Sequence, residues 1–201
     1  MIKLFPTPVY KFSLIRHETY KKKFIKPILK KYRENPASTF DWARNCNSWQ
    51  VNVDDINMDL TDIGEEIMQG CKQYLIELGA AGNFRITDNW FNVHTSDMYQ
   101  EVHDHVPDLI SGTYYLQFDK AKYNPLTFVS DNSSFTNTAL AMGIPMQDYK
   151  YIKLDVDEGD VLLFPSTLRH MVTKAKEPHN TLRITNSFNI RPFIPQGTHD
   201  S

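Results

Sequence analysis

The sequence predicts a mainly β protein with flanking helices, an α+β domain in which helices near the amino terminus pack on one face of an antiparallel sandwich or barrel. Hydrophobic residues recur at helical spacing in the first part of the chain. From Phe84 onward, short apolar segments alternate with clusters of Asn, Asp, Gly and Pro. With 201 residues, of which 41% are hydrophobic and 12% aromatic, the chain can bury one substantial core. We therefore expect a single domain over residues 1–201, with residues 1–83 as a helical support region.

Two helices are predicted in the support region. The first covers residues 18–33, where Pro27 must lie near a helix start or introduce a kink because proline lacks an amide hydrogen. The second covers about residues 60–78, with Asp59 placed to cap its first turn and Gly79 to close its last. Both helices carry an apolar face that can pack on a sheet.

Eight short strands are predicted in the rest of the chain, over residues 84–94, 98–105, 111–118, 125–129, 150–155, 160–164, 168–174 and 181–190. Their mostly short connections favour an antiparallel sandwich or barrel. Residues 130–148 are the exception, a long polar connection. We interpret this segment as either a lid or a mobile surface insertion, because loops of this length in compact domains are usually functional or disordered.

Charge and cysteine content argue against several classes of function. The formal net charge of -2 argues against nucleic acid or an anionic membrane as a partner, and we interpret the lysines of the first helix as a solvated face. Cys46 and Cys71 form no paired motif, so we expect both to be reduced. The sequence has no apolar run of about 18 residues and no cleavable leader pattern, which predicts a soluble, cytoplasmic protein.

The pattern His103-Asp104-His105 is typical of a metal site. Alternate side chains of a strand project to opposite faces, so His103 and His105 share a face and Asp104 points away. His170 follows an apolar run that we interpret as a buried strand, and imidazole suits iron, zinc, copper or nickel. The alternative is that these histidines are merely hydrogen-bonded residues on a polar strand face. The histidines that lack partners at diagnostic spacing are assigned no role: His17, His94, His179 and His199.

The last predicted strand carries a candidate anion-binding residue. Arg183, Thr185 and Ser187 alternate with apolar and amide residues, so they lie on a common face that can line the barrel. A guanidinium group offers two parallel hydrogen bonds to a carboxylate. The alternative for Arg183 is a surface ion pair.

At these residues the sequence resembles the iron(II)- and 2-oxoglutarate-dependent oxygenases, in particular a group of phage and bacterial members. The shared blocks are His103-Asp104-His105, SGTYYL from Ser111 to Leu116, LFPSTLRHMV from Leu163 to Val172, and RITNSFN from Arg183 to Asn189, with a similar opening from Leu4 to Val9. The resemblance implies a double-stranded β-helix, a form of jelly roll, over residues 84–191.

The resemblance also implies a ligand set. The implied iron(II) ligands are His103, His105 and His170, and the implied binding residues for the cosubstrate 2-oxoglutarate are Arg183, Thr185, Asn92 and Tyr115. Arg183 would bind its distal carboxylate, with Thr185 in support. Most relatives in the wider superfamily have Asp or Glu where this chain has His105. Asp104 could supply a carboxylate only after a bulge, and Asp108 is a weaker reserve candidate.

The implied activity is hydroxylation of an unknown substrate with O2 and 2-oxoglutarate as small-molecule cosubstrates, and a peptide side chain such as proline is one candidate substrate. Two alternatives stay open. One is a cupin-type oxygenase that binds its metal through three histidines and does not use 2-oxoglutarate. The other is a phage-associated interaction module that keeps the barrel without catalysis. The oligomeric state is not indicated by any of these patterns.

Overall fold

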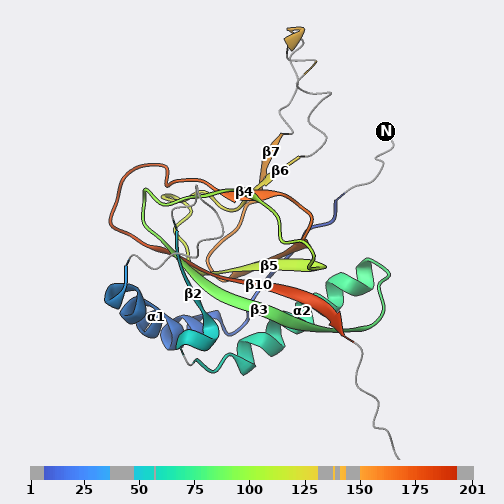
Figure 1. The fold of residues 1–201 in the computed structure, drawn as a ribbon, viewed down its shortest axis with the longest axis horizontal. Coiled ribbons are helices and arrows are strands. Elements are labelled where there is room, and N and C mark those ends of the chain that lie inside the picture. Colours follow the sequence, from blue (N-terminus) through green and yellow to red (C-terminus); the bar gives the residue numbers. More distant parts are fainter. Residues whose placement is uncertain are drawn as a thin grey trace, which may run out of the picture.

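Two antiparallel sheets face each other, and two helices pack on the outer face of the larger sheet (Figure 1). The computed structural model describes residues 7–36, 48–56, 58–130, 138, 141–143 and 150–193. The helical elements are α1 (His17–Glu34), the short 3-10 helix η1 (Val53–Ile56) and α2 (Thr61–Glu77). The strands are β1 (Tyr10–Ser13), β2 (Trp49–Asn52), β3 (Asn83–His94), β4 (Gln100–His103), β5 (Ile110–Gln117), β6 (Thr127–Val129), β7 (Tyr151–Lys153), β8 (Asp160–Pro165), β9 (His170–Val172) and β10 (Arg183–Phe193).

The larger sheet has the strand order β1-β8-β5-β10-β3-β2 and separates two hydrophobic cores. Side chains alternate along each strand, so one set faces the helices and the other faces the smaller sheet. On β5, for example, Tyr114 and Leu116 pack with the helices, whereas Tyr115 packs between the sheets. The smaller sheet has the order β4-β9-β6-β7. Phe128 and Val172 of this sheet contribute to the inner core.

Most of the predicted elements are confirmed. Each of the eight predicted strand segments contains a strand, and both predicted helices form within one residue of their expected bounds. Gly79 closes α2 as predicted, with a φ angle of 68°. Asp59 accepts the backbone N–H of Thr61 at 3.0 Å at the start of the same helix. Pro27 lies inside α1 and not near its start.

The description of residues 1–83 as a helical support region is incomplete. Two strands from this region, β1 and β2, form the outer strands of the larger sheet, where β1 pairs with β8 and β2 pairs with β3. Neither strand was predicted, because a four-residue segment gives too short a run for a strand-type alternation to stand out.

Some predictions concern residues outside the described ranges. These are the opening block from Leu4 to Pro6, the thiol state of Cys46, and most of residues 130–148, the segment interpreted as either a lid or a mobile surface insertion. Cys71 is described, and its thiol is free and buried. Among the described residues, neither long helix combines the length and apolar character needed to cross a bilayer.

The sheet tolerates no side chain at Gly112, and this gives a test of the fold. A Cβ atom at Gly112 of β5 would overlap the ring of Phe188, whereas a Cβ atom at Gly64 of α2 would meet nothing within 4 Å. Overpacking should make Gly112→Ala lower the free energy of unfolding by about 1–3 kcal/mol. Gly64→Ala should raise it by about 0.5–1 kcal/mol because alanine favours the helix. Denaturant unfolding measures both changes, and equal stability of the two variants would contradict the close packing of Phe188 against β5.

Candidate metal centre

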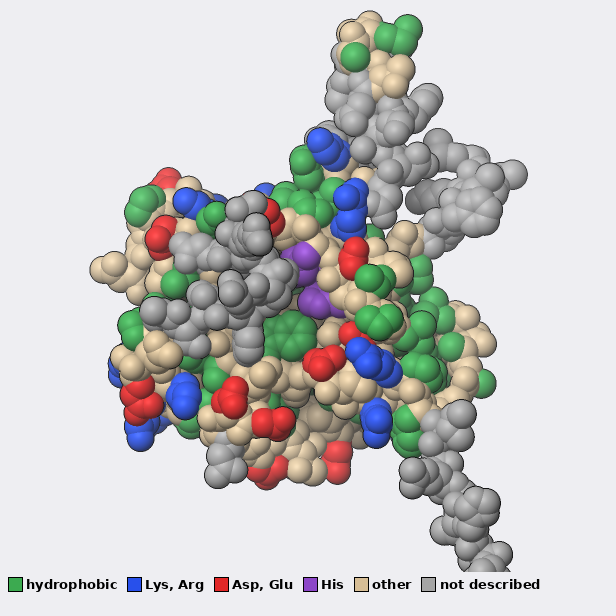
Figure 2. Space-filling model, in the orientation of Figure 1, with side chains coloured by type: hydrophobic (Ala, Val, Ile, Leu, Met, Phe, Trp, Pro, Cys, Tyr) green, Lys and Arg blue, Asp and Glu red, His purple; other side chains and the backbone are tan. Residues whose placement is uncertain are grey.

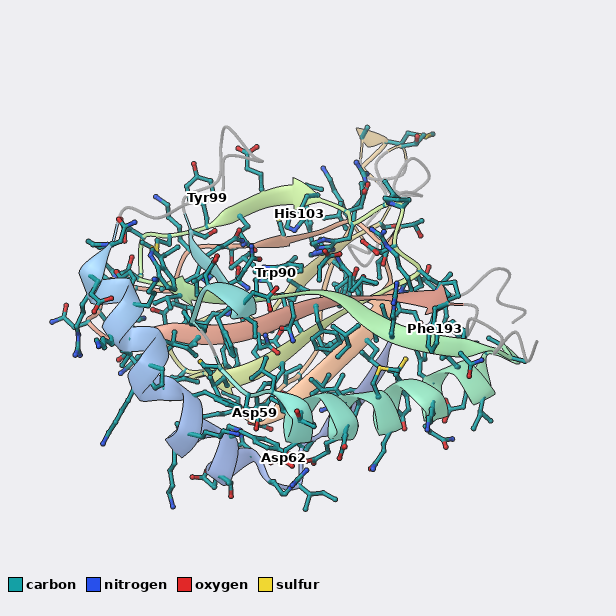
Figure 3. The ribbon with its side chains drawn as sticks, turned by 60° about the horizontal axis from the view of Figure 1, so that its bottom comes forward. Asp59, Asp62, Trp90, Tyr99, His103 and Phe193 are labelled. Atoms are coloured by element: carbon teal, nitrogen blue, oxygen red, sulfur yellow. The ribbon has the colours of Figure 1, made fainter. Side chains whose placement is uncertain are left out.

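Three histidines converge at one end of the smaller sheet. His103 is the last residue of β4 and His170 is the first residue of β9, and the two are cross-strand partners. His105 lies two residues beyond the end of β4, where its backbone N–H donates to the carbonyl oxygen of Ser166 at 2.9 Å. Figure 3 shows His103 on the smaller sheet and Trp90 on the larger one, and both line the space between the sheets.

The spacing of the three imidazoles suits a single metal ion. Their donor atoms all lie within 4.8 Å of one another, and the Nε2 atoms of His105 and His170 are 3.2 Å apart. Two nitrogen ligands that each lie about 2.0–2.1 Å from a metal are roughly 2.8–3.4 Å apart when the angle between them is about 90–109°. The described side chains therefore need little movement to share an ion.

Hydrogen bonds to the backbone orient two of these rings. The Nδ1 atom of His103 lies 2.6 Å from the carbonyl oxygen of Glu101, and Nδ1 of His170 lies 2.8 Å from that of Leu168. A carbonyl oxygen only accepts, so Nδ1 carries the hydrogen and Nε2 keeps the lone pair that binds metals. Burial lowers the pKa of all three imidazoles, and that of His105 falls to about 4. The rings are therefore neutral at physiological pH, which is the form that binds metal.

Arg183 is a buried cation with no anionic partner in the described part of the chain. Its side chain is 1% exposed, and its charged end lies 5.6 Å from the ring centre of Tyr115 and 5.8 Å from that of Phe118. One Nη1 contact reaches the carbonyl oxygen of Asn124 at 3.4 Å. Among the described residues no carboxylate pairs with the guanidinium group, and its Nε has no hydrogen-bond partner. A buried charge without a partner is costly, so this site is suited to an anionic ligand.

The other residues predicted to bind the cosubstrate already form hydrogen bonds within the protein. Asn92 donates to the hydroxyls of Thr185 at 3.3 Å and Ser187 at 3.0 Å, and its Oδ1 accepts from Gln50 at 2.8 Å. Asn92 therefore holds the hydroxyl groups of β10 in place. The Tyr115 hydroxyl accepts the backbone N–H of Leu126 at 3.0 Å, which leaves its own hydrogen to donate.

One cavity joins the histidines to the arginine. Its walls include the three histidines together with Arg183, Thr185 and Ser187, and its volume is about 20 Å³. A second, wider hollow of about 270 Å³ opens beside the histidines. It is lined by Gln50, Asn52, Asp88, Trp90, His103, Asp104, His105 and Asn189. Figure 2 shows histidine side chains reaching the surface near the centre of this face, with acidic and hydrophobic side chains around them.

A family model for 2OG-Fe(II) oxygenases matches residues 88–189, just over half of the chain, and this range includes the three histidines and Arg183. The chain belongs to the 2OG-Fe(II) oxygenase family. No curated protein is similar enough in sequence to be matched to this oxygenase.

Solved structures of other oxygenases share the fold. The prolyl-4-hydroxylase of Pseudomonas putida aligns with a TM-score of 0.62 at 10% identity over 94% of each chain. A prolyl hydroxylase of Trichoplax adhaerens, in complex with a peptide fragment of the hypoxia inducible factor oxygen degradation domain, gives 0.60 at 14% identity over 92% of this chain and 83% of that chain. The carbocyclase SnoK from nogalamycin biosynthesis gives 0.63 at 12% identity over 95% and 85%. The predicted double-stranded β-helix is confirmed.

The residues of this chain fit the two groups that its family uses, iron(II) and 2-oxoglutarate. Three neutral imidazoles form a donor set that suits iron(II), although most such oxygenases combine two histidines with a carboxylate. The guanidinium of Arg183 offers the charge and the unused N–H group that an organic acid needs. The structure therefore places His103, His105 and His170 where they could hold the metal, and Arg183 on the wall of the same cavity.

The two reserve carboxylates are not brought to the histidine cluster. Asp104 is exposed at the wider hollow, and its Oδ1 accepts the backbone N–H of Val106 at 3.3 Å. Asp108 forms an ion pair with Arg191 on β10. Among the described residues, it is His105, and neither of these carboxylates, that lies with His103 and His170 where three side chains could hold one metal ion.

Several residues of the site were not predicted from the sequence. Trp90 lies beside His105, with 5.7 Å between the ring centres, and Gln100 donates to Asn92 at 3.2 Å. His94, to which no role was assigned, lies on β3 directly opposite Arg183. The alternation along the predicted strand over residues 84–94 was a usable signal, since it places Trp90 and His94 on the same face as Asn92.

Proposed function

We propose that this protein is an iron(II)- and 2-oxoglutarate-dependent dioxygenase that hydroxylates a side chain of a peptide or protein, with proline as the first candidate. The observation that carries the proposal is the single cavity lined both by the three-histidine cluster and by Arg183, a buried arginine without a carboxylate partner among the described residues. A metal and a dicarboxylic acid would then bind side by side in one interior space.

Each group of side chains around the cavity has a separate proposed role. His103, His105 and His170 hold the metal through Nε2, and Arg183 with Thr185 holds the distal carboxylate of 2-oxoglutarate. When bound, the iron supplies the oxidative chemistry in which 2-oxoglutarate and O2 become succinate and carbon dioxide and the substrate gains a hydroxyl group. Leu126, Phe164 and Val172, which line the inner cavity, limit the access of water to this space.

The wider hollow beside the histidines is the proposed substrate entrance. Its amide and carboxylate side chains offer donors and acceptors to a peptide backbone, and Trp90 offers a flat apolar surface. Two of the three solved structures named above are prolyl hydroxylases, and one of these is in complex with a peptide fragment. These likenesses support a peptide substrate for this chain as a proposal.

Succinate formation tests the proposed reaction. Purified protein given iron(II), 2-oxoglutarate, O2 and a proline-containing peptide should form succinate, and mass spectrometry should detect hydroxyproline in the peptide. Omission of iron, or addition of the inert analogue N-oxalylglycine, should stop succinate formation. Failure of the iron-loaded protein to bind 2-oxoglutarate in anaerobic calorimetry would refute the proposal.

One observation favours a second candidate function. The third position of the cluster is His105 and not a carboxylate, as in metal oxygenases of the cupin type that do not use 2-oxoglutarate. A protein that binds the metal but neither binds 2-oxoglutarate nor responds to it would favour this second function. Protein that binds no metal under anaerobic conditions would instead favour an interaction module.

A further inference from the structure

His94 is a buried side chain beside Arg183 that the proposed reaction does not yet use. The residue is 1% exposed and is the direct cross-strand partner of Arg183, since β3 and β10 pair in antiparallel register. Directly paired residues of neighbouring strands project to the same face, with Cβ atoms about 4.5–5.5 Å apart. Asn92, two residues before His94 on β3, lines the cavity from that face. The His94 ring therefore projects to the same face of the sheet as Arg183 and Asn92.

Three buried nitrogen atoms of His94 and Arg183 have no hydrogen-bond partner within the part of the chain that the structure describes. Among the described residues, neither ring nitrogen of His94 has a hydrogen-bond partner, and the same holds for Nε of Arg183. Buried polar groups in native proteins are nearly always hydrogen-bonded, so adjacent orphaned atoms indicate a ligand or an ordered water.

The surroundings favour an anionic ligand over an additional cation. Burial, and secondarily the charge of Arg183, lowers the pKa of His94 well below its usual value, so the ring is neutral and keeps one N–H donor. The Tyr123 hydroxyl lies 3.1 Å from the backbone carbonyl oxygen of His94 and fixes the strand at this point. A neutral N–H donor on the same sheet face as a guanidinium matches the two oxygens of one carboxylate.

We propose that His94 and Arg183 together bind the distal carboxylate of the cosubstrate, with the guanidinium contacting one oxygen and the imidazole N–H the other. This inference rests on the proposed use of 2-oxoglutarate and adds a second residue to the recognition of its acid end. His94 would thus be a specificity residue that favours a dicarboxylic 2-oxo acid over a monocarboxylic one.

The test compares two variants and two acids. His94→Leu removes the ring donor, whereas His94→Gln keeps an N–H group at a similar reach. The acids are 2-oxoglutarate and 2-oxovalerate, which has the same oxo acid head and the same number of carbons with a methyl group in place of the distal carboxylate. Affinities are measured by anaerobic calorimetry on iron(II)-loaded protein, and thermal unfolding of the metal-free variants checks the fold.

We expect His94→Leu to bind 2-oxoglutarate about 10- to 100-fold more weakly than the native protein, which is the usual effect of losing a hydrogen bond to a charged group. His94→Gln should stay within about threefold, because it keeps a hydrogen-bond donor to the carboxylate. Affinity for 2-oxovalerate and for iron(II) should not change. Without ligand, His94→Leu should unfold at the same temperature or higher, since it removes an unsatisfied buried group.

Three results would overturn the inference. If His94→Leu bound 2-oxoglutarate as tightly as the native protein does, the His94 ring would contact only a buried water and not the cosubstrate. An equal loss for both acids would mean that His94 acts through the fold or the metal end of the cavity. Failure of the native protein to bind 2-oxoglutarate would contradict the proposed function itself. This outcome is distinguishable from the first two because the native protein is titrated beside each variant.

Discussion

His170→Ala is expected to abolish metal binding. His170 is the most buried of the three histidines, at 3% exposed, and its loss leaves two imidazoles, one of them beyond the end of a strand. Loss of a residue that merely orients a ligand typically costs 10- to 100-fold in metal affinity, so loss of the ligand itself should cost more than about 100-fold. Anaerobic calorimetry with iron(II), together with metal analysis of the dialysed protein, measures the change.

Asp104→Asn is the matched control for the metal site. Asp104 lies between His103 and His105 in the sequence but is exposed and outside the cluster of donor atoms. An exposed charge interaction is worth at most about 1 kcal/mol, so iron affinity should stay within about fivefold of the native value. If Asp104→Asn lost as much affinity as His170→Ala, the third ligand would be the carboxylate and the assignment of His105 would be wrong.

Arg183→Met is expected to remove 2-oxoglutarate binding while the protein keeps its metal and its fold. Removal of one partner from a buried charge pair costs about 2–5 kcal/mol, which is at least about 30-fold in affinity. Without ligand the variant should be as stable as the native protein or more stable, because a buried guanidinium without a carboxylate partner is replaced by an apolar side chain. Calorimetry and thermal unfolding measure the two effects.

Arg191→Met on the same strand is the control for charge. Arg191 is exposed and pairs with Asp108, so its loss removes one positive charge from β10 without touching the cavity. We expect unchanged affinity for 2-oxoglutarate. Equal losses in the two variants would show that net charge, and not the position of Arg183 in the cavity, governs binding of the acid.

Short-range patterns were sufficient for most of the secondary structure and for the faces of the site strands. The alternation of Arg183, Thr185 and Ser187 predicted that these residues line one wall, and they do. The same reasoning applied to β3 places His94 on the face of Asn92, but the alternation alone does not show that this face meets Arg183. The strands β1 and β2 were missed because each is only four residues long.

Contacts between residues far apart in the chain did not follow from local patterns, and only the grouping of the three histidines was implied by the family resemblance. His105 and His170 are 65 residues apart, and Arg191 meets Asp108 across 83 residues. Neither contact follows from a local period, since each depends on sheet order and register. The pairing of Asp108 with Arg191 also removes this carboxylate as a ligand, which no pattern around Asp108 indicated.

By itself, the sequence determined the alternating strands, the two helices and the identity of the side chains that point into the interior. The tertiary structure decided which of those side chains meet. The turn of the chain after β4 carries His105 to His170, and the pairing of β3 with β10 places His94 against Arg183. The physical reason is that a side chain's face follows from its neighbours along the strand, whereas its contacts follow from the strands that pack beside and across from it.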